Sequence, residues 1–286
     1  MDRIMFGDNQ FFGVNHMSDE KAHAQAMRFR NTEAILAVLD DAYDCGIRTF
    51  MCTTHDQISD VAAHVAAHPE RYRGLKFHPG MPYAHKYANM VGELGMVETM
   101  RQVAPGGLFE AAARGMRSTL TKDLQHLMRI LVDAEMVRFG VVETPVVFLQ
   151  NVVADLLLGS GMHGLLAAFH EYVAERYQAE AGYFTMNMPR MVQALKSEGI
   201  VDPIICCNYN AIGFRMCGGI ELYDRTLETE EVRCIAMSVL ASGAIPVDHA
   251  VRWVCERPQI RSIVFGASSR SNIAQTVDLI ERYSST

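Results

Sequence analysis

The stretch that decides the fold is "TEAILAVLDDAYDCGIRTFMC", residues 32–52. Its apolar side chains recur at helical spacing from Ile35 onward, which predicts a helix with one buried face that Thr32 can cap. Gly46 is typical of a helix C-terminus, and residues 47–51 follow it as a short strand rich in β-forming side chains. The stretch is therefore one helix–turn–strand step of an α/β fold.

The same step recurs along the whole chain. The expected strands are residues 3–7, 47–51, 72–78, 143–151, 182–187, 202–210, 233–239 and 261–266. Eight strands alternating with helices over 286 residues predict a single (β/α)8 TIM-barrel domain with a parallel sheet. The alternative is a doubly wound sheet, but that fold favours a G-x-G-x-x-G turn after an early strand, and the sequence contains none.

One interval is too long for a single strand–helix unit. Residues 83–145 predict a helical insertion after the third strand. Because the loops that follow barrel strands lie at the barrel mouth, we expect this insertion to serve as a lid or as an oligomer contact.

Composition limits the partners. The formal net charge is −7 with no basic run, so a general nucleic-acid binder is not expected. The first residues lack a basic region followed by a long apolar stretch, and polar residues interrupt the most apolar later segment, so we expect no membrane partner. Seven cysteines without a C-x-x-C pattern indicate reduced thiols. We therefore expect a cytoplasmic protein with a small-molecule substrate, and a homo-oligomer remains open.

A TIM barrel builds its active site from residues at the C-terminal ends of its strands. The polar residues that we place there are Asp8, Asn9, His16, Cys52, His55, Asp56, Lys76, His78, Gln150, Asn151, Asn187, Asn208, Asn210 and Ser238. Barrel mouths are polar by default, but as a set these residues predict a ligand site. No metal site is predicted, because the histidines lack H-x-H or H-E-x-x-H spacing and carboxylates are scarce at the strand ends.

Two groups in this set could move protons. Lys76 is the only lysine on an expected strand, and burial could make it a base or a Schiff-base amine. The alternative is a side chain that extends to the rim and serves no chemistry. His55 and Asp56 could form an acid–base pair, although adjacent residues on a strand point to opposite faces.

The turn "GASSRSN", residues 266–272, follows the last strand and precedes a helix. Backbone N–H groups of Gly266, Ala267 and Ser268, together with the helix dipole, can hold an anion, and Arg270 could add a forked positive charge. The alternative is an ordinary turn in which a serine caps the helix. We favour the anion site because phosphate sites recur after strands seven and eight of such barrels.

The last third of the chain resembles the aldo-keto reductases. The similar segments are "CNYNAIGFRM" (207–216), "IAMSVLASG" (235–243) and "IPVDHAVRWVCERPQIRSIVFGASSRSNIAQTV" (245–277), while residues 33–54 match more loosely. The resemblance implies a bound NADP or NAD. The cofactor-binding residues that it implies are Ser238, Leu240, Gly266, Ala267, Ser268, Arg270 and Asn272.

The catalytic tetrad of that family is not kept. Cys52 stands at the position of the family's aspartate and Gln57 near that of its tyrosine, Lys76 or His78 falls at its lysine, and Gln150 or Asn151 replaces its histidine. The resemblance thus implies a rebuilt site, with Lys76, His78, His55, Cys52 and Asn151 as the candidate catalytic residues. In it His55 or His78 would donate the proton and Lys76 would polarise the carbonyl.

We therefore expect a divergent NAD(P)-dependent oxidoreductase of a small polar carbonyl or sugar-like substrate. One alternative is a non-redox lyase, isomerase or aldolase that acts on a small phosphorylated substrate. A second alternative is a catalytically silent binding subunit.

Overall fold

The computed structural model describes residues 1–12, 24–25, 27–82 and 117–284, with only the backbone described for residues 117–123. Its strands are β1 (Ile4–Gly7), β2 (Thr49–Thr53), β3 (Lys76–Met81), β4 (Val146–Leu149), β5 (Glu180–Thr185), β6 (Ile204–Asn208), β7 (Arg233–Met237) and β8 (Ile260–Phe265). They pair in parallel and in sequence order, and β8 closes on β1. The predicted TIM barrel is confirmed.

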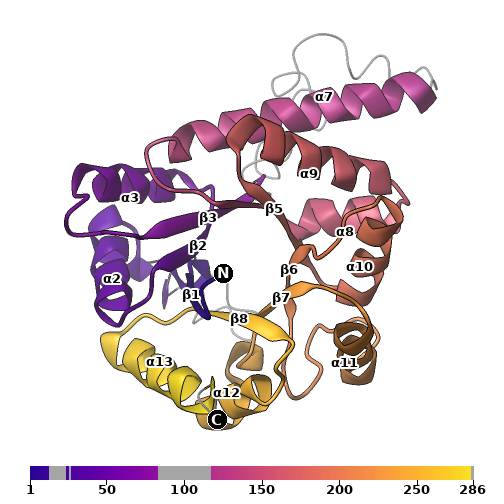
Figure 1. The fold of residues 1–286 in the computed structure, drawn as a ribbon. Coiled ribbons are helices and arrows are strands. Elements are labelled where there is room, and N and C mark those ends of the chain that lie inside the picture. The colour runs from indigo at the N-terminus through magenta and orange to yellow at the C-terminus, as the bar shows by residue number, and fades with distance from the viewer. Residues whose placement is uncertain (13–23, 26, 83–116, 285–286) are drawn as a thin grey trace.

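Helices surround the barrel on its outside (Figure 1). They are α2 (Thr32–Asp44), α3 (Asp56–Ala67), α7 (Arg117–Met136), α8 (Asn151–Gly159), α9 (His163–Tyr177), α10 (Met188–Ser197), α11 (Ile220–Thr229), α12 (Val247–Cys255) and α13 (Arg270–Ser284). Short 3-10 turns form η1 (Asn9–Phe12), η2 (Val137–Phe139) and η3 (Ala241–Gly243). Within the described ranges, no helix combines the length and apolar character needed to cross a membrane.

The helix–turn–strand step at residues 32–52 forms as predicted, except for its cap. The side chain of Asn31, not Thr32, accepts a hydrogen bond from the Ala34 N–H at 3.1 Å. Asparagine is among the strongest N-cap residues because its side-chain oxygen reaches the unpaired N–H groups of the first turn. Gly46 has φ 91°, a left-handed value that lets the chain leave α2 and enter β2.

Side chains alternate between two cores. The barrel interior holds Met5, Met51, Val146, Phe148, Ile204, Cys206, Ile235 and Val264. Phe50 and Cys52, the neighbours of Met51 on β2, belong instead to the larger core between the strands and the helices. Gly182 is required in the interior, because a Cβ there would lie 2.3 Å from the Phe148 ring.

The third strand lies later in the chain than predicted. β3 begins at Lys76 and continues through Pro79 to Met81, whereas the expected strand covers residues 72–78. The proline is tolerated because β3 pairs with β2 from Lys76 onward, while its ladder with β4 begins only at Gly80. This shift of register decides where Lys76 and His78 lie.

The predicted helical insertion is confirmed in its second half. α7 packs on α9, where the Tyr172 hydroxyl donates to the Asp133 carboxylate at 2.7 Å. Figure 1 shows α7 outside α9 and farther from the barrel axis. Residues 83–116 lie outside the described residues, so the lid or oligomer contact stays a prediction.

Candidate active site

The C-terminal ends of the parallel strands form one rim, and Asp8 stands on it directly after β1. Only 4% of its surface is exposed. Its Oδ2 accepts hydrogen bonds from the Thr53 N–H at 2.6 Å and from the Thr53 hydroxyl at 2.7 Å. Burial raises the pKa of Asp8 to about 6, although the bonds from Thr53 act in the opposite direction. Asp8 can therefore change protonation state near neutral pH, which the sequence alone did not reveal.

The Gln10 side chain lies against the C-terminal ends of β1 and β8, next to Gly7 and Gly266. Its Nε2 donates to the Gly7 carbonyl at 2.8 Å, while its Oε1 is buried with no hydrogen-bond partner among the described residues. A Cβ on Gly266 would lie 2.0 Å from that Oε1, so glycine is needed for the side chain of Gln10 to enter. An unpaired buried acceptor at a barrel mouth is a position where a ligand N–H can bind.

The loop after β7 has an uncommon backbone. Ser238, Ala241 and Ser242 have φ values of 54°, 46° and 59°. Left-handed conformations cost energy in residues other than glycine and cluster at functional sites. Ser238 and Leu240, both predicted to bind a cofactor, thus belong to a strained loop on the rim. This loop lies beside the turn after β8, because the two strands are neighbours.

The turn after β8 leads into α13 as predicted. The Ser269 hydroxyl accepts a hydrogen bond from the Asn272 N–H at 3.4 Å, so a serine does cap the helix. Arg28 lies against the same turn, where its Nη2 donates to the Ser268 carbonyl at 2.7 Å. Gly266 is exposed, and Ala267 and Ser268 are partly exposed. The turn therefore offers backbone groups, a helix N-terminus and one exposed guanidinium to a ligand.

The guanidinium of Arg270 pairs with α2. Its Nη1 lies 3.3 Å from the Asp41 carboxylate and 3.6 Å from that of Asp44, both on α2. The structure thus adds Arg28 as a positive charge that contacts the turn directly, and the part of Arg270 in the anion site stays a prediction. Arg28 stands far from the turn in the sequence, so no local motif could have revealed it.

Lys76 and His78 do not line the mouth, and that prediction is wrong. Lys76 is the first residue of β3, at the opposite end of the barrel, with its Nζ 3.7 Å from the Asp2 carboxylate. His78 is buried in the barrel interior, with its ring 6.1 Å from that of Phe148. Burial lowers the pKa of His78 to about 4, so the ring is neutral. Both errors follow from placing the strand too early in the chain.

Cys52 is also excluded from the mouth by its orientation. It belongs to the core between strands and helices, and burial raises the pKa of its thiol well above the ordinary value, with Asp8 adding to the effect. Asn151 lies near the end of β4, separated from it by Gln150, as the first residue of α8. Its role stays a prediction.

His55 lies at the rim but performs a structural task. Its Nδ1 accepts a hydrogen bond from the Gln57 N–H at 3.2 Å and so caps α3, and its ring packs 4.2 Å from that of Phe12. Burial lowers the pKa of His55 below its usual value. Asp56 forms an ion pair with Arg138 and also acts electrostatically on the His55 ring, so the acid–base pair considered from the sequence stays a prediction.

The asparagines of the rim mainly brace loops. Asn187 caps α10, Asn208 donates to the Arg215 carbonyl at 3.2 Å, and Asn210 donates to the Phe214 carbonyl at 3.0 Å. His16 of the polar set predicted at the mouth lies outside the described residues; among the described members, Asp8 is the ionisable group that is buried on the rim. No cluster of three or more His, Cys, Asp or Glu residues suited to a metal occurs in the described part of the chain.

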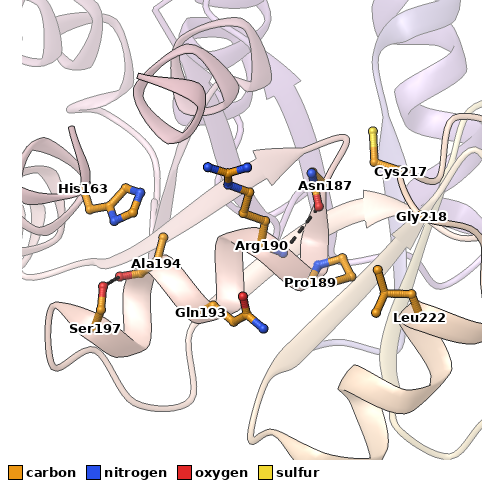
Figure 2. A pocket seen from close by; sticks show the side chains of 10 residues that line it. All are labelled: His163, Asn187, Pro189, Arg190, Gln193, Ala194, Ser197, Cys217, Gly218 and Leu222. Carbon is orange, nitrogen blue, oxygen red and sulfur yellow. Dashed lines mark hydrogen bonds between the residues drawn. The ribbon is translucent and has the colours of Figure 1, made fainter. Parts of the chain in front are cut away.

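A separate hollow of about 560 Å³ follows the outer face of α10 (Figure 2). Its lining residues include His163, Arg190, Ser197 and Cys217, and none of the predicted catalytic residues is among them. Most of its lining lies on the helical layer, but Asn187, which caps α10 after β5, also belongs to the polar set predicted at the mouth, so the hollow adjoins the rim.

Comparisons with known proteins place this barrel among the aldo-keto reductase structures. A Pseudomonas aeruginosa protein assigned as an aldo-keto reductase matches with a TM-score of 0.57 at 13% identity over 99% of this chain and 90% of its own. MGS-M4, an aldo-keto reductase enzyme from a Medee basin deep-sea metagenome library, matches with a TM-score of 0.56 at 11% identity over 100% and 90%. A variant of Gox0644 in complex with NADPH matches with a TM-score of 0.54 at 9% identity over 98% and 83%.

No known protein-family profile matches the chain, and neither does any curated protein. At these sequence identities the similarity establishes the fold. The resemblance seen in the sequence is thus confirmed as a shared barrel.

Proposed function

We propose that the protein is an oxidoreductase that uses NADP or NAD to interconvert a small polar carbonyl or sugar-like substrate and its alcohol. The observation that carries the proposal is the pair of adjacent turns on the rim, the strained loop after β7 and the helix-opening turn after β8. The similarity to a barrel that was crystallised with NADPH supports it.

The residues present fit a dinucleotide. The first N–H groups of α13 and the exposed Arg28 suit a phosphate, and the loop from Ser238 to Gly243 suits the extended linker between the two nucleosides. The unpaired Oε1 of Gln10 suits a ligand carboxamide N–H. A bound nicotinamide supplies or accepts the hydride, and the chain supplies binding, orientation and the proton.

The non-redox alternative loses its main residue. A Schiff-base lyase or aldolase was expected to use Lys76, which pairs with Asp2 at the far end of the barrel. The turn after β8 could still hold the phosphate of a phosphorylated substrate. The catalytically silent subunit likewise stays open until turnover is measured.

The test is a titration of the purified protein with NADPH and NADH, followed by nicotinamide fluorescence. We expect saturable binding in the micromolar range. Arg28→Ala should weaken binding about tenfold, equivalent to about 1.4 kcal/mol, because an exposed guanidinium near a phosphate is lost.

The matched control is Arg270→Ala, which removes a guanidinium from the same turn that already pairs with Asp41 and Asp44. It should change the dissociation constant less than about twofold. Absence of binding up to millimolar cofactor would overturn the proposal and make a substrate phosphate the expected ligand of the turn.

A further inference from the structure

The proposed reaction needs an acid at the mouth. Of the two histidines expected to donate the proton, His78 lies in the barrel interior, and His55 stays a candidate on the rim. Gln57 stands near the position of the family's tyrosine, but its Nε2 donates to the carbonyls of Phe29 at 3.1 Å and Arg30 at 3.0 Å, and an amide is not an acid. Lys76 lies at the other end of the barrel, and His55 uses its Nδ1 to cap a helix.

Asp8 has the geometry that these residues lack. It stands on the rim and is buried, and both bonds from Thr53 fall on Oδ2, so Oδ1 is the oxygen to which we assign the proton. The two hydrogen bonds from Thr53, on the neighbouring strand β2, hold the Asp8 carboxyl in a fixed position. A fixed position favours proton transfer to a bound substrate.

We propose that Asp8 is the catalytic acid–base of this barrel and exchanges a proton with the substrate oxygen, with Thr53 as its positioning residue. This inference rests on the proposed function. In the reductive direction Asp8 gives the proton on Oδ1 to the carbonyl oxygen while a hydride from the reduced nicotinamide adds to the carbonyl carbon. The C=O group becomes CH–OH, the nicotinamide loses two electrons, and the Asp8 carboxylate takes a proton from water.

The electrostatic surroundings suit this role. Burial holds the pKa of Asp8 near 6, so acid and carboxylate are both accessible at neutral pH. Among the described residues, the titratable group that interacts with it is Cys52, whose raised pKa keeps the thiol neutral. The hydrogen bonds from Thr53 stabilise the carboxylate that forms when the proton leaves.

The test compares two similar aspartate–threonine pairs. Asp8→Asn is measured beside Asp2→Asn, because Asp2 accepts a bond from the Thr49 hydroxyl at 2.5 Å at the opposite end of the same two strands. The probe is NADPH with glyceraldehyde and other small polyhydroxy aldehydes and ketones. We expect Asp8→Asn to bind NADPH within about twofold of the wild type and to lose about 10²-fold to 10⁴-fold in kcat, as for a lost general acid. Asp2→Asn should keep its rate.

A second readout does not depend on turnover. Infrared difference spectra should show a protonated carboxyl that titrates near pH 6 in the wild type and in Asp2→Asn, and that is missing in Asp8→Asn. Thr53→Val removes one bond to the carboxylate, so it should move this titration, and the alkaline limb of the rate profile, to higher pH.

The outcomes separate the two proposals. If the wild type binds no nicotinamide cofactor, the proposed function fails whatever Asp8 does. If it binds and Asp8→Asn keeps its rate within about threefold, or the carboxyl is missing from the infrared titration, the role of Asp8 is overturned. Should Asp8→Asn not fold, or no tested carbonyl turn over, the infrared titration of wild type and Thr53→Val decides.

Discussion

The two ends of strands β1 and β2 carry the same pair of residue types in different surroundings. At the N-terminal end Asp2 accepts a bond from Thr49, lies 3.7 Å from the Lys76 ammonium, and is about one third exposed. At the mouth Asp8 accepts two bonds from Thr53, is buried, and pairs with no lysine or arginine of the described residues.

The two aspartates differ in whether a positive charge lies nearby and in how far water reaches the carboxylate. The Asp2 end is closed further by the Ser262 hydroxyl, which donates to the Asp2 carbonyl at 2.6 Å. A charge that is paired and partly hydrated stabilises the fold modestly, because solvent screens the ion pair. A buried carboxyl without a neighbouring cation instead has a raised pKa, so its protonated and charged forms are closer in free energy at neutral pH. The same residue pair thus closes one end of the barrel and leaves the other end reactive.

His78 is a second buried titratable group, and it extends this contrast because it is a base, whereas Asp8 is an acid. Its ring is neutral in the folded protein, and the charged groups that act on it are Asp2, Lys76 and the N-terminal amine. Burial disfavours the charged form in both cases, so it raises the pKa of an acid and lowers the pKa of a base. The two groups should therefore tilt the pH dependence of stability in opposite directions.

The largest expected effect comes from His78. Its pKa is lowered from 6.5 to about 4, so the stability linked to its neutral form is present above pH 6.5 and is lost as the pH falls towards 4. The full loss is about 3 kcal/mol, from about 1.4 kcal/mol per pKa unit. Urea unfolding from pH 4 to 7.5 should show that His78→Gln lacks this acid-side loss. Parallel curves for wild type and variant would mean that the ring is protonated or solvated.

Asp8→Asn should give a slightly smaller effect of the opposite sign. The pKa of Asp8 is raised from 3.8 to about 6, so the stability linked to its protonated form is present below pH 3.8 and is lost as the pH rises through 6. Removing the charge should therefore stabilise the protein above pH 6 by roughly 2 to 3 kcal/mol, while it costs activity. The control Asp2→Asn should show no such gain, and a destabilised Asp8→Asn at pH 8 would contradict the burial argument.

Sequence periodicity was sufficient to predict the barrel. The Thr32–Cys52 step and its repeats carry local signals, namely apolar spacing, glycine at helix ends and short β-branched runs. These signals fix the order of the helices and strands. Eight strands in this order, joined by right-handed crossovers, favour closure of the parallel sheet into a barrel.

The site could be predicted only where a residue's position on its strand was correct. Placing β3 about three residues too early put Lys76 and His78 at the wrong end, since three residues span about 10 Å along a strand. The prediction for Cys52 was wrong because its side chain faces the helices. Neighbouring strand residues face opposite sides of the sheet, so a shift of one residue reverses the orientation. Asp8 had the right signal, a carboxylate directly after the first strand, but its burial and its bonds to Thr53 depend on a pairing that no local pattern contains.

The smallest effect is expected from Lys76, at the closed end. Lys76→Met removes an ion pair whose partners are each about one third exposed, with 3.7 Å between Nζ and Oδ1. Solvent screening limits such pairs to about 1 kcal/mol or less, so urea midpoints should move little. Nicotinamide binding and turnover should match the wild type, and borohydride should trap no substrate on the wild-type lysine. A rate loss of about tenfold or more would require Lys76 to act on the mouth from the far end of the barrel, and would break the division between a closed end and a reactive one.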